Sequence, residues 1–227
     1  EVILKKDVLL HYPYQAFSHT IDILREAAID PAVTAISINL YRIANNSKII
    51  NALINASKNG KDVTVIVELR ARFDEEYNIE CSRRLQENGV KVISGVEGLK
   101  VHAKLVLITR KVGLKKVDIA HIGTGNFHEG NARIYTDHSL WTADTRITHE
   151  VAKLFEFFHH NFKPGIYREL IVSPFNTRRR ITELIDIEIK NAKEGKTAYM
   201  VVKLNNLVDE ELVRKLYKAS QAGVKIQ

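Results

Sequence analysis

Two apolar strand patterns that alternate with helical patterns constrain the fold of this chain most. Residues 33–40 and 63–69 have the composition of buried strands, and a helical pattern that Ser47 is expected to cap lies between them. A second helical pattern at 74–88 leads to a short apolar strand at 90–93. This β-α-β-α-β order predicts a parallel sheet with right-handed crossovers. We expect an α/β fold whose ligand site lies beyond the carboxyl ends of these strands.

The stretch 99–108 predicts a further strand with His102 and Lys104 on the same face. A six-residue turn at 111–116 joins it to a strand at 117–122, and so short a connection predicts a hairpin. The hairpin would return the turn at 123–126 to the edge where His102 lies, which is also where the first strands end. The polar groups expected to converge there are Arg42, Arg72, His102, Lys104 and Asn126.

These residue types suit an anionic substrate. An imidazole can attack or move a proton, and an ammonium group can hold a phosphate oxygen. A glycine-rich turn such as 123–126 can cradle a phosphate with its backbone N–H groups. Each feature also has a plainer interpretation as a solvated surface residue or an ordinary turn. Tyr135, in a segment at 132–140 that is expected to form a strand, could stack on a base or pack in the core.

The charge balance favours polyanionic partners. The net charge is +7 and the pI is near 9.4, which suits nucleic acid, polyphosphate, nucleotides or acidic lipid. Cys81 is the single cysteine, which favours a reducing, cytoplasmic setting. We find no apolar run near the ~18 residues of a membrane span and no zinc-binding motif. His149, His159 and His160 are interpreted as surface residues of a helix that begins near Asp144.

A helix-breaking segment at 161–165 predicts a boundary between residues 1–163 and 164–227. The second part resembles the first in order: 174–176 matches 13–15, 200–206 matches 36–42, and 219–223 matches 56–60. We interpret this as a duplicated domain whose second copy is incomplete. Because the chain begins with Glu1 and ends in an apparent strand, we expect it to be part of a longer protein.

The H-x-K tripeptide, the glycine-asparagine turn and the duplication resemble the phospholipase D superfamily. In that superfamily two histidines from two similar domains face each other across one site. The family pattern has an aspartate five residues beyond the lysine, where this chain has Thr109. That departure weakens an assignment as a phosphodiesterase.

A more specific resemblance is to the polyphosphate kinases that make long-chain polyphosphate from ATP, and it covers essentially the whole chain. The blocks that carry it are 41–44, 68–75, 101–104, 121–127, 135–137 and 204–209. The resemblance implies a phospholipase D-like, mixed but largely parallel sheet flanked by helices, with the start of a second such domain. It also implies that the chain is a central to C-terminal fragment of the family's polypeptide.

Roles for individual residues follow from this resemblance. It implies that His102 takes the γ-phosphate of ATP as a phosphohistidine, and that Arg42 and Arg72 contact phosphate near a Mg²⁺ site. It implies that Tyr135 contacts the nucleotide. We add Lys104 as a cation that neutralises the transferred group and Asn126 as a residue that orients it.

The resulting hypothesis is an ATP:polyphosphate phosphotransferase in a bacterial cytoplasm, with ATP, ADP and polyphosphate as ligands and no nucleic acid. The family implies a homo-oligomer and an association with the inner membrane. We expect the isolated fragment to be inactive, because the second histidine would lie beyond Gln227. The alternatives are a phosphodiesterase or nuclease of the related superfamily, and a non-catalytic module that binds polyanions.

Overall fold

A computed structural model describes residues 1–44, 46–69, 75–160 and 165–227 of the chain. The chain divides into two compact units, Glu1–Gly165 and Ile166–Gln227. The first contains β1 (Val8–Tyr12), α1 (Ser18–Ile29), β2 (Val33–Leu40), α2 (Lys48–Lys58), β3 (Asp62–Val67), α3 (Glu75–Glu87) and β4 (Lys91–Ser94). It continues with β5 (Leu105–Val112), β6 (Lys115–Gly123), the 3₁₀ turn η1 (Asn131–Arg133), β7 (Asp137–Thr142) and α4 (Thr145–His159).

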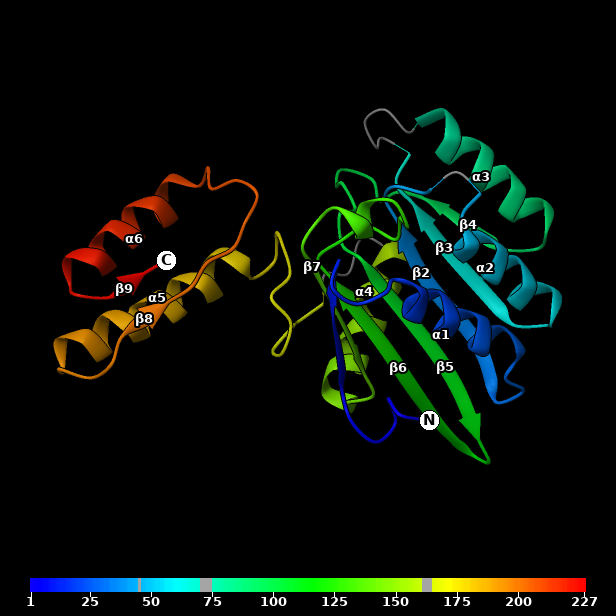
Figure 1. Ribbon diagram of the computed structural model, residues 1–227, viewed down its shortest axis with the longest axis horizontal. Coiled ribbons are helices and arrows are strands. Elements are labelled where there is room, and N and C mark those ends of the chain that lie inside the picture. Colours follow the sequence, from blue (N-terminus) through cyan, green and yellow to red (C-terminus); the bar gives the residue numbers. More distant parts are fainter. Residues whose placement is uncertain (45, 70–74, 161–164) are drawn as a thin grey trace. The chain divides into compact units, whose positions relative to one another are not determined.

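The strands of the first unit form one seven-stranded sheet in the order β1-β7-β6-β5-β2-β3-β4 (Figure 1). The predicted parallel pairing of β2, β3 and β4 and the predicted β5-β6 hairpin are confirmed, and β5 pairs antiparallel with β2. From these pairings, β1, β2, β3, β4 and β6 run in one direction and β5 and β7 in the other. The mixed α/β sheet expected from the sequence is therefore confirmed.

Helices cover both faces of this sheet. Val106 and Ile108 of β5 belong to the core cluster under α1, α2 and α3, whereas the alternate residues Leu105 and Leu107 face the other side. That other side is covered by α4, which packs on β5 and β6 (Figure 1). The predicted cap of α2 is confirmed, since the Ser47 side chain accepts a hydrogen bond from Ile49 N at 3.2 Å.

Two strand predictions need correction. The strand expected at 99–108 begins only at Leu105, because the side chain of Asn39 hydrogen-bonds the backbone of Ala103 and Leu105 where ladder bonds to β2 would otherwise form. His102 and Lys104 are thus in an irregular segment and do not share a strand face. The strand expected at 132–140 begins at Asp137, because residues 131–133 form η1.

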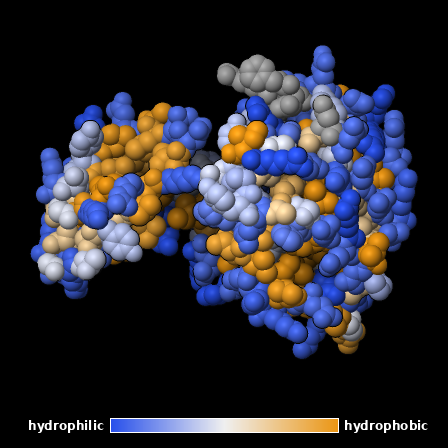
Figure 2. Space-filling model, in the orientation of Figure 1, coloured by the Kyte–Doolittle hydropathy of each residue, from blue (hydrophilic) through white to orange (hydrophobic). Residues whose placement is uncertain are grey.

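The second unit contains α5 (Thr177–Lys193), β8 (Tyr199–Met200), α6 (Glu210–Gln221) and β9 (Lys225–Ile226). β8 and β9 pair in parallel, and α5 packs on α6 around a small cluster centred on Ile185, Ala219 and Val224. Several large apolar side chains of this unit are exposed, among them Tyr199 and Val201. Figure 2 shows hydrophobic residues over much of its visible face.

Candidate active site

The candidate site lies at the edge of the sheet where β2 and β3 end (Figure 1). Because β5 runs antiparallel to β2, with Val106 opposite Ile38, the segment that leads into β5 lies beyond the end of β2. β6 ends at the same edge and continues into the turn at 123–126, and β7 begins there. The topology therefore gathers four loops around one place, as expected from the hairpin.

His102 presents its ring at this edge. The side chain is exposed, and the ring packs edge-to-face on Tyr41, with ring centroids 4.6 Å apart at an interplanar angle of 77°. Two lysines also lie against the Tyr41 ring: Lys104 Nζ is 5.1 Å and Lys100 Nζ is 5.5 Å from its centroid. The Tyr41 ring is thus a shared platform for one imidazole and two ammonium groups.

Lys104 lies deeper than His102. Its side chain is only 4% exposed, and its Nζ donates a hydrogen bond to the carbonyl oxygen of His102. Burial lowers the pKa of Lys104 to about 8, and the carboxylate of Asp137 opposes this shift. An ammonium group that has already lost much of its water interacts more strongly with an anion than a fully hydrated one does.

The surroundings of His102 favour its neutral form. Partial loss of water around the ring is the largest cause that lowers its pKa, although one side of it is open to solvent. The charges of Lys104, Lys100 and Arg42 lower the pKa further, which places Arg42 within electrostatic reach of the ring. A neutral imidazole at physiological pH has a free nitrogen lone pair and can act as a nucleophile.

The turn after β6 contacts this group through its backbone. Gly123 N donates to the carbonyl oxygen of Lys104 at 2.9 Å. Thr124 Oγ1 donates to Asp137 Oδ1 at 2.8 Å, and a Cβ at Gly125 would lie only 2.8 Å from Cβ of Asp137. The glycine at 125 therefore allows Asp137 to approach the turn, and Asp137 in turn acts on the charge of Lys104.

The remaining predicted site residues are Asn126, Tyr135 and Arg72. Asn126 belongs to the turn that contacts Lys104, and its Oδ1 is buried with no hydrogen-bond partner among the described residues. Tyr135 is 57% exposed in the loop between η1 and β7, and its backbone N–H donates to Asn131 O at 2.9 Å. The prediction for Arg72 lies outside the described residues.

His121 lies beside the backbone of Lys104 and Gly123, whereas Thr109 lies toward the far end of β5. His121 is buried, its Nε2 is 2.8 Å from Ser139 Oγ, and burial lowers its pKa to about 3, so it stays neutral. Thr109 pairs with Ala35 near the start of β2, at the far end of the strand from His102. Its Oγ1 donates to Asp118 Oδ1 at 2.7 Å. Thr109 therefore contributes a side-chain hydrogen bond within the sheet and does not reach the site.

Sequence reasoning did not single out Tyr41 or Asp137 as members of the site. Tyr41 directly precedes Arg42, and nothing in its local pattern separates a platform ring from a core ring. For Asp137 a signal was available, because the two glycines of the turn at 123–126 indicate that another group approaches the backbone closely.

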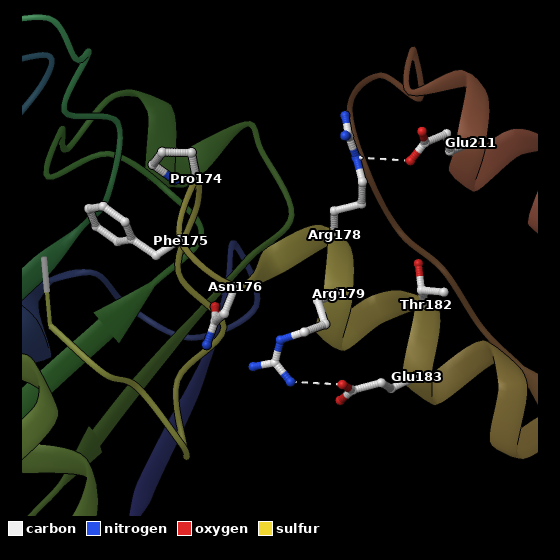
Figure 3. Close-up of a pocket in the computed structure, with 8 residues that line it drawn as sticks. All are labelled: Pro174, Phe175, Asn176, Arg178, Arg179, Thr182, Glu183 and Glu211. Carbon is white, nitrogen blue, oxygen red and sulfur yellow. Dashed lines mark hydrogen bonds and ion pairs between the residues drawn. The ribbon is translucent and has the colours of Figure 1, made fainter.

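A separate pocket of about 430 Å³ lies within the second unit, beside the first turns of α5 (Figure 3). Its arginines face carboxylates: Arg178 lies 3.6 Å from Glu211, and Arg179 lies 2.7 Å from Glu183. Arg178 also pairs with Asp209 at 2.7 Å. The charges of this pocket are therefore largely compensated from within, in contrast to the cationic surroundings of His102.

Among the described residues, no three His, Cys, Asp or Glu side chains gather where they could hold a metal ion. Arg42 offers only N–H donors and no lone pair, so it suits a phosphate rather than a metal. In the same part of the chain, no helix combines the length and apolarity needed to cross a membrane.

Comparisons with known proteins agree with one another. The family model described as polyphosphate kinase C-terminal domain 1 matches residues 1–164, and the one described as C-terminal domain 2 matches residues 170–227. The chain is 55% identical over 227 residues to a polyphosphate kinase of Vibrio vulnificus and 53% identical over 226 residues to that of Escherichia coli K12. Each match covers the whole chain, which spans only 32% and 33% of these relatives.

Solved structures give the same result. The crystal structure of polyphosphate kinase from Porphyromonas gingivalis matches the whole chain and 38% of its own, with a TM-score of 0.89 at 45% identity. The phospholipase D family member Nuc from Salmonella typhimurium matches 72% of this chain and 99% of its own, with a TM-score of 0.53 at 17% identity. The second match shows a phospholipase D-like fold and nothing about the reaction.

Proposed function

Because this chain belongs to the polyphosphate kinase family, we propose that it forms part of the catalytic region of an enzyme that transfers the γ-phosphate of ATP to polyphosphate. The observation that supports this proposal most is the setting of His102. Its ring is accessible, its pKa is lowered, and three cationic side chains act on it. A nucleophile with these properties suits attack on a phosphate group whose charge must be neutralised.

In the proposed reaction, a ring nitrogen of His102 attacks the γ-phosphorus of ATP. A nitrogen–phosphorus bond forms, the bond to the β–γ bridging oxygen breaks, and ADP leaves with that electron pair. A terminal oxygen of polyphosphate then attacks the phosphohistidine, and the imidazole is released with its lone pair restored. Each step is reversible, so the same site can make ATP from polyphosphate and ADP.

The neighbouring residues have distinct proposed roles. Lys104 and Arg42 neutralise the transferred group, and Arg72 joins them as an expectation from the family resemblance. We assign Asn126, which belongs to the turn that contacts Lys104, to orienting the phosphate, to which its side-chain Nδ2 can donate. Tyr135, whose side chain is exposed, is assigned to the nucleotide on the family resemblance.

For Mg²⁺ we propose binding through the phosphates of ATP. The described residues offer no carboxylate cluster, and arginine cannot ligate a cation. Mg²⁺ commonly keeps several waters and is held by substrate phosphates with one or two carboxylates. When bound, it would offset phosphate charge; the residues of this chain would hold the phosphates themselves.

The whole activity is a proposal for a protein longer than this chain, since the chain spans a third of its relatives. We propose that residues 1–227 alone have little or no turnover, because the second histidine of the family's site would lie outside them. A homo-oligomer and a peripheral association with the inner membrane belong to the same proposal.

The test is phosphoenzyme labelling in a full-length polyphosphate kinase that carries this chain. With γ-³²P-ATP, His102→Ala should abolish the acid-labile label, whereas His149→Ala, which removes an exposed histidine of α4, should leave it unchanged. Label that persists at another residue in His102→Ala would contradict the assignment. Unchanged polyphosphate binding with no label even in the wild type would favour the non-catalytic module.

A phosphodiesterase or nuclease remains the enzymatic alternative. The fold that this chain shares with Nuc is compatible with it, and Thr109 lies too far from His102 to exclude it. Turnover of a chromogenic phosphodiester that is lost in His102→Ala would favour this alternative over phosphoryl transfer to polyphosphate.

A further inference from the structure

We propose that Asn39 is the residue that positions His102, because its buried side-chain amide fixes the backbone on both sides of Lys104. Glu68 assists by holding the residue before His102. This inference rests on the proposed role of His102 and adds to it the reason why the ring stays where it can attack.

Asn39 lies near the end of β2 and is 1% exposed. Its Nδ2 donates to the carbonyl oxygen of Ala103, and its Oδ1 accepts a hydrogen bond from Leu105 N at 2.6 Å. The last ladder pair between β2 and β5 is Ile38 with Val106. Beyond this pair, the Asn39 side chain and not the backbone of β2 hydrogen-bonds the backbone of residues 103 and 105.

Glu68 holds the other side of His102. The residue follows β3, is 3% exposed, and its Oε2 accepts a hydrogen bond from Val101 N at 3.0 Å. Asn78 of α3 connects this contact to the aromatic platform, because its Nδ2 donates to Glu68 O at 3.1 Å and to Tyr41 O at 2.9 Å. Asn78 therefore holds the backbone of Tyr41 directly and the backbone before His102 through Glu68.

Only an amide meets both demands at position 39. The backbone presents one acceptor, Ala103 O, and one donor, Leu105 N, and a carboxamide supplies the matching donor and acceptor at once. A leucine of similar size would leave both backbone groups without their partner. An ionised aspartate would keep the bond to Leu105 but would face Ala103 O with an oxygen.

The consequence for His102 is one of placement. Residues 101–104 have no helix or strand assignment, so side-chain bonds replace a ladder in fixing them. Releasing this segment would let the imidazole drift from its contact with Tyr41 and from the cations that act on it. A displacement of about 1 Å from a productive geometry can lower a rate about 100-fold.

The experiment compares three variants of a full-length polyphosphate kinase that carries this chain. For Asn39→Leu we expect kcat and the labelling rate of His102 to fall about 100-fold, with KM for ATP within about threefold of wild type. Thr64→Val, which removes a buried hydroxyl from β3 of the same sheet, should leave both constants within about threefold. Asn39→Asp should regain activity relative to wild type as the pH is lowered, because the protonated carboxyl recovers the donor.

Hydrogen exchange provides a readout that does not depend on activity. In Asn39→Leu, peptides covering residues 101–105 should exchange faster, while β3 and α2 exchange as in wild type. Unchanged kcat, or unchanged exchange at 101–105, would overturn the role of Asn39 alone. If the wild type is never labelled at His102, the phosphohistidine proposal fails first, and the catalytic role of Asn39 fails with it even where the exchange result holds.

Discussion

Residues 18–67 of the first unit and 177–226 of the second have the same order of elements. The first segment reads α1-β2-α2-β3 and the second α5-β8-α6-β9, and in each the two strands are parallel neighbours. The turns that precede them also agree. Gln15 N donates to His11 O while His11 N donates to Gln15 Oε1, and Asn176 and Val172 exchange the same two bonds.

The ends of the second helices match as well. Lys61 N donates to Ala56 O at 3.1 Å, and Val224 N donates to Ala219 O at 3.0 Å. Ala56 and Ala219 are both fully buried. The offset between matching residues is 161 at the turns and 163 at the helix ends, and this agreement in hydrogen bonds supports the duplication hypothesis.

The two segments differ in what surrounds their strands. β2 lies between β5 and β3, and its Ile36 and Ile38 are fully buried. β8 has only two residues and its partner in the described chain is β9; Tyr199 is 62% and Val201 69% exposed. In the first unit β5 pairs with β2, and the irregular segment that leads into β5 supplies His102. The difference indicates that the site is a product of long-range pairing, which the frame alone cannot provide.

The largest expected effect tests whether the cations around His102, which the second unit lacks in the described chain, drive the reaction. Lys104→Ala removes a buried cation that only the first unit supplies, and we expect phosphoryl transfer in the full-length enzyme to fall about 10²–10³-fold, as for other preorganised charge stabilisers. Lys190→Ala, an exposed lysine of α5 that is 3.8 Å from Glu194, should have almost no effect. Comparable losses in both variants would mean that general charge, and not the site, drives the reaction.

The next effect concerns packing, with a matched pair of leucines. Leu53 of α2 is 0% exposed, and Leu216 occupies the corresponding position of α6 but is only partly buried. We expect Leu53→Ala to lower the free energy of unfolding of the first unit by about 3 kcal/mol, and Leu216→Ala to lower that of the second by about 1 kcal/mol. Hydrogen exchange of α2 and α6 in the same chain measures both.

Equal losses from the two leucines would contradict the idea that the second segment is less completely packed. A larger loss at Leu216 would show that its small cluster carries more of the stability of its unit than its exposure suggests.

Much of the fold could be predicted because its helices and turns depend on residues that are close together in the sequence. The periodic helices, the cap at Ser47 and the hairpin are confirmed, although the hairpin connection is only residues 113–114, because residues 111, 112, 115 and 116 are paired in β5 and β6. The boundaries of the strand before His102 could not be predicted, because they depend on Asn39. That residue is 64 positions from its partner Ala103, and its pattern is that of any polar residue in a strand.

The site was predicted less completely than the fold. Arg42, Lys104 and His102 were expected to meet; Lys104 and His102 both lie against the Tyr41 ring, and the charge of Arg42 lowers the pKa of His102. Sequence patterns did not show that Lys104 is buried while His102 is exposed, nor that Lys100, Lys104 and His102 all lie against the Tyr41 ring. Both facts follow from tertiary packing, which no short motif encodes.

A third, smaller effect is the pH dependence of labelling. Because the ammonium form of Lys104 is the one that holds an anion and its pKa is about 8, the rate should fall above pH 8 by about tenfold per pH unit. On the acid side the rate should hold at pH 6.5, since the pKa of His102 is lowered and the ring stays neutral there. Lys104→Arg should move the alkaline fall to higher pH; an unchanged profile would remove Lys104 from the site.

The smallest expected effect is a difference between the caps of α2 and α6 in how their contribution to stability depends on pH. Ser47 caps α2 with a hydroxyl, and Asp209 caps α6 with a carboxylate that accepts from Leu212 N at 3.0 Å and pairs with Arg178. That bond, followed by Arg178, lowers the pKa of Asp209 in the folded state, so its contribution is present above pH 4 and is lost as the pH falls below it. Urea titrations should show a loss of about 1 kcal/mol for Ser47→Ala at both pH 7 and pH 3. The loss for Asp209→Asn should appear at pH 7 and shrink at pH 3, and a loss that is equal at the two pH values would show that the charge of Asp209 does not stabilise α6.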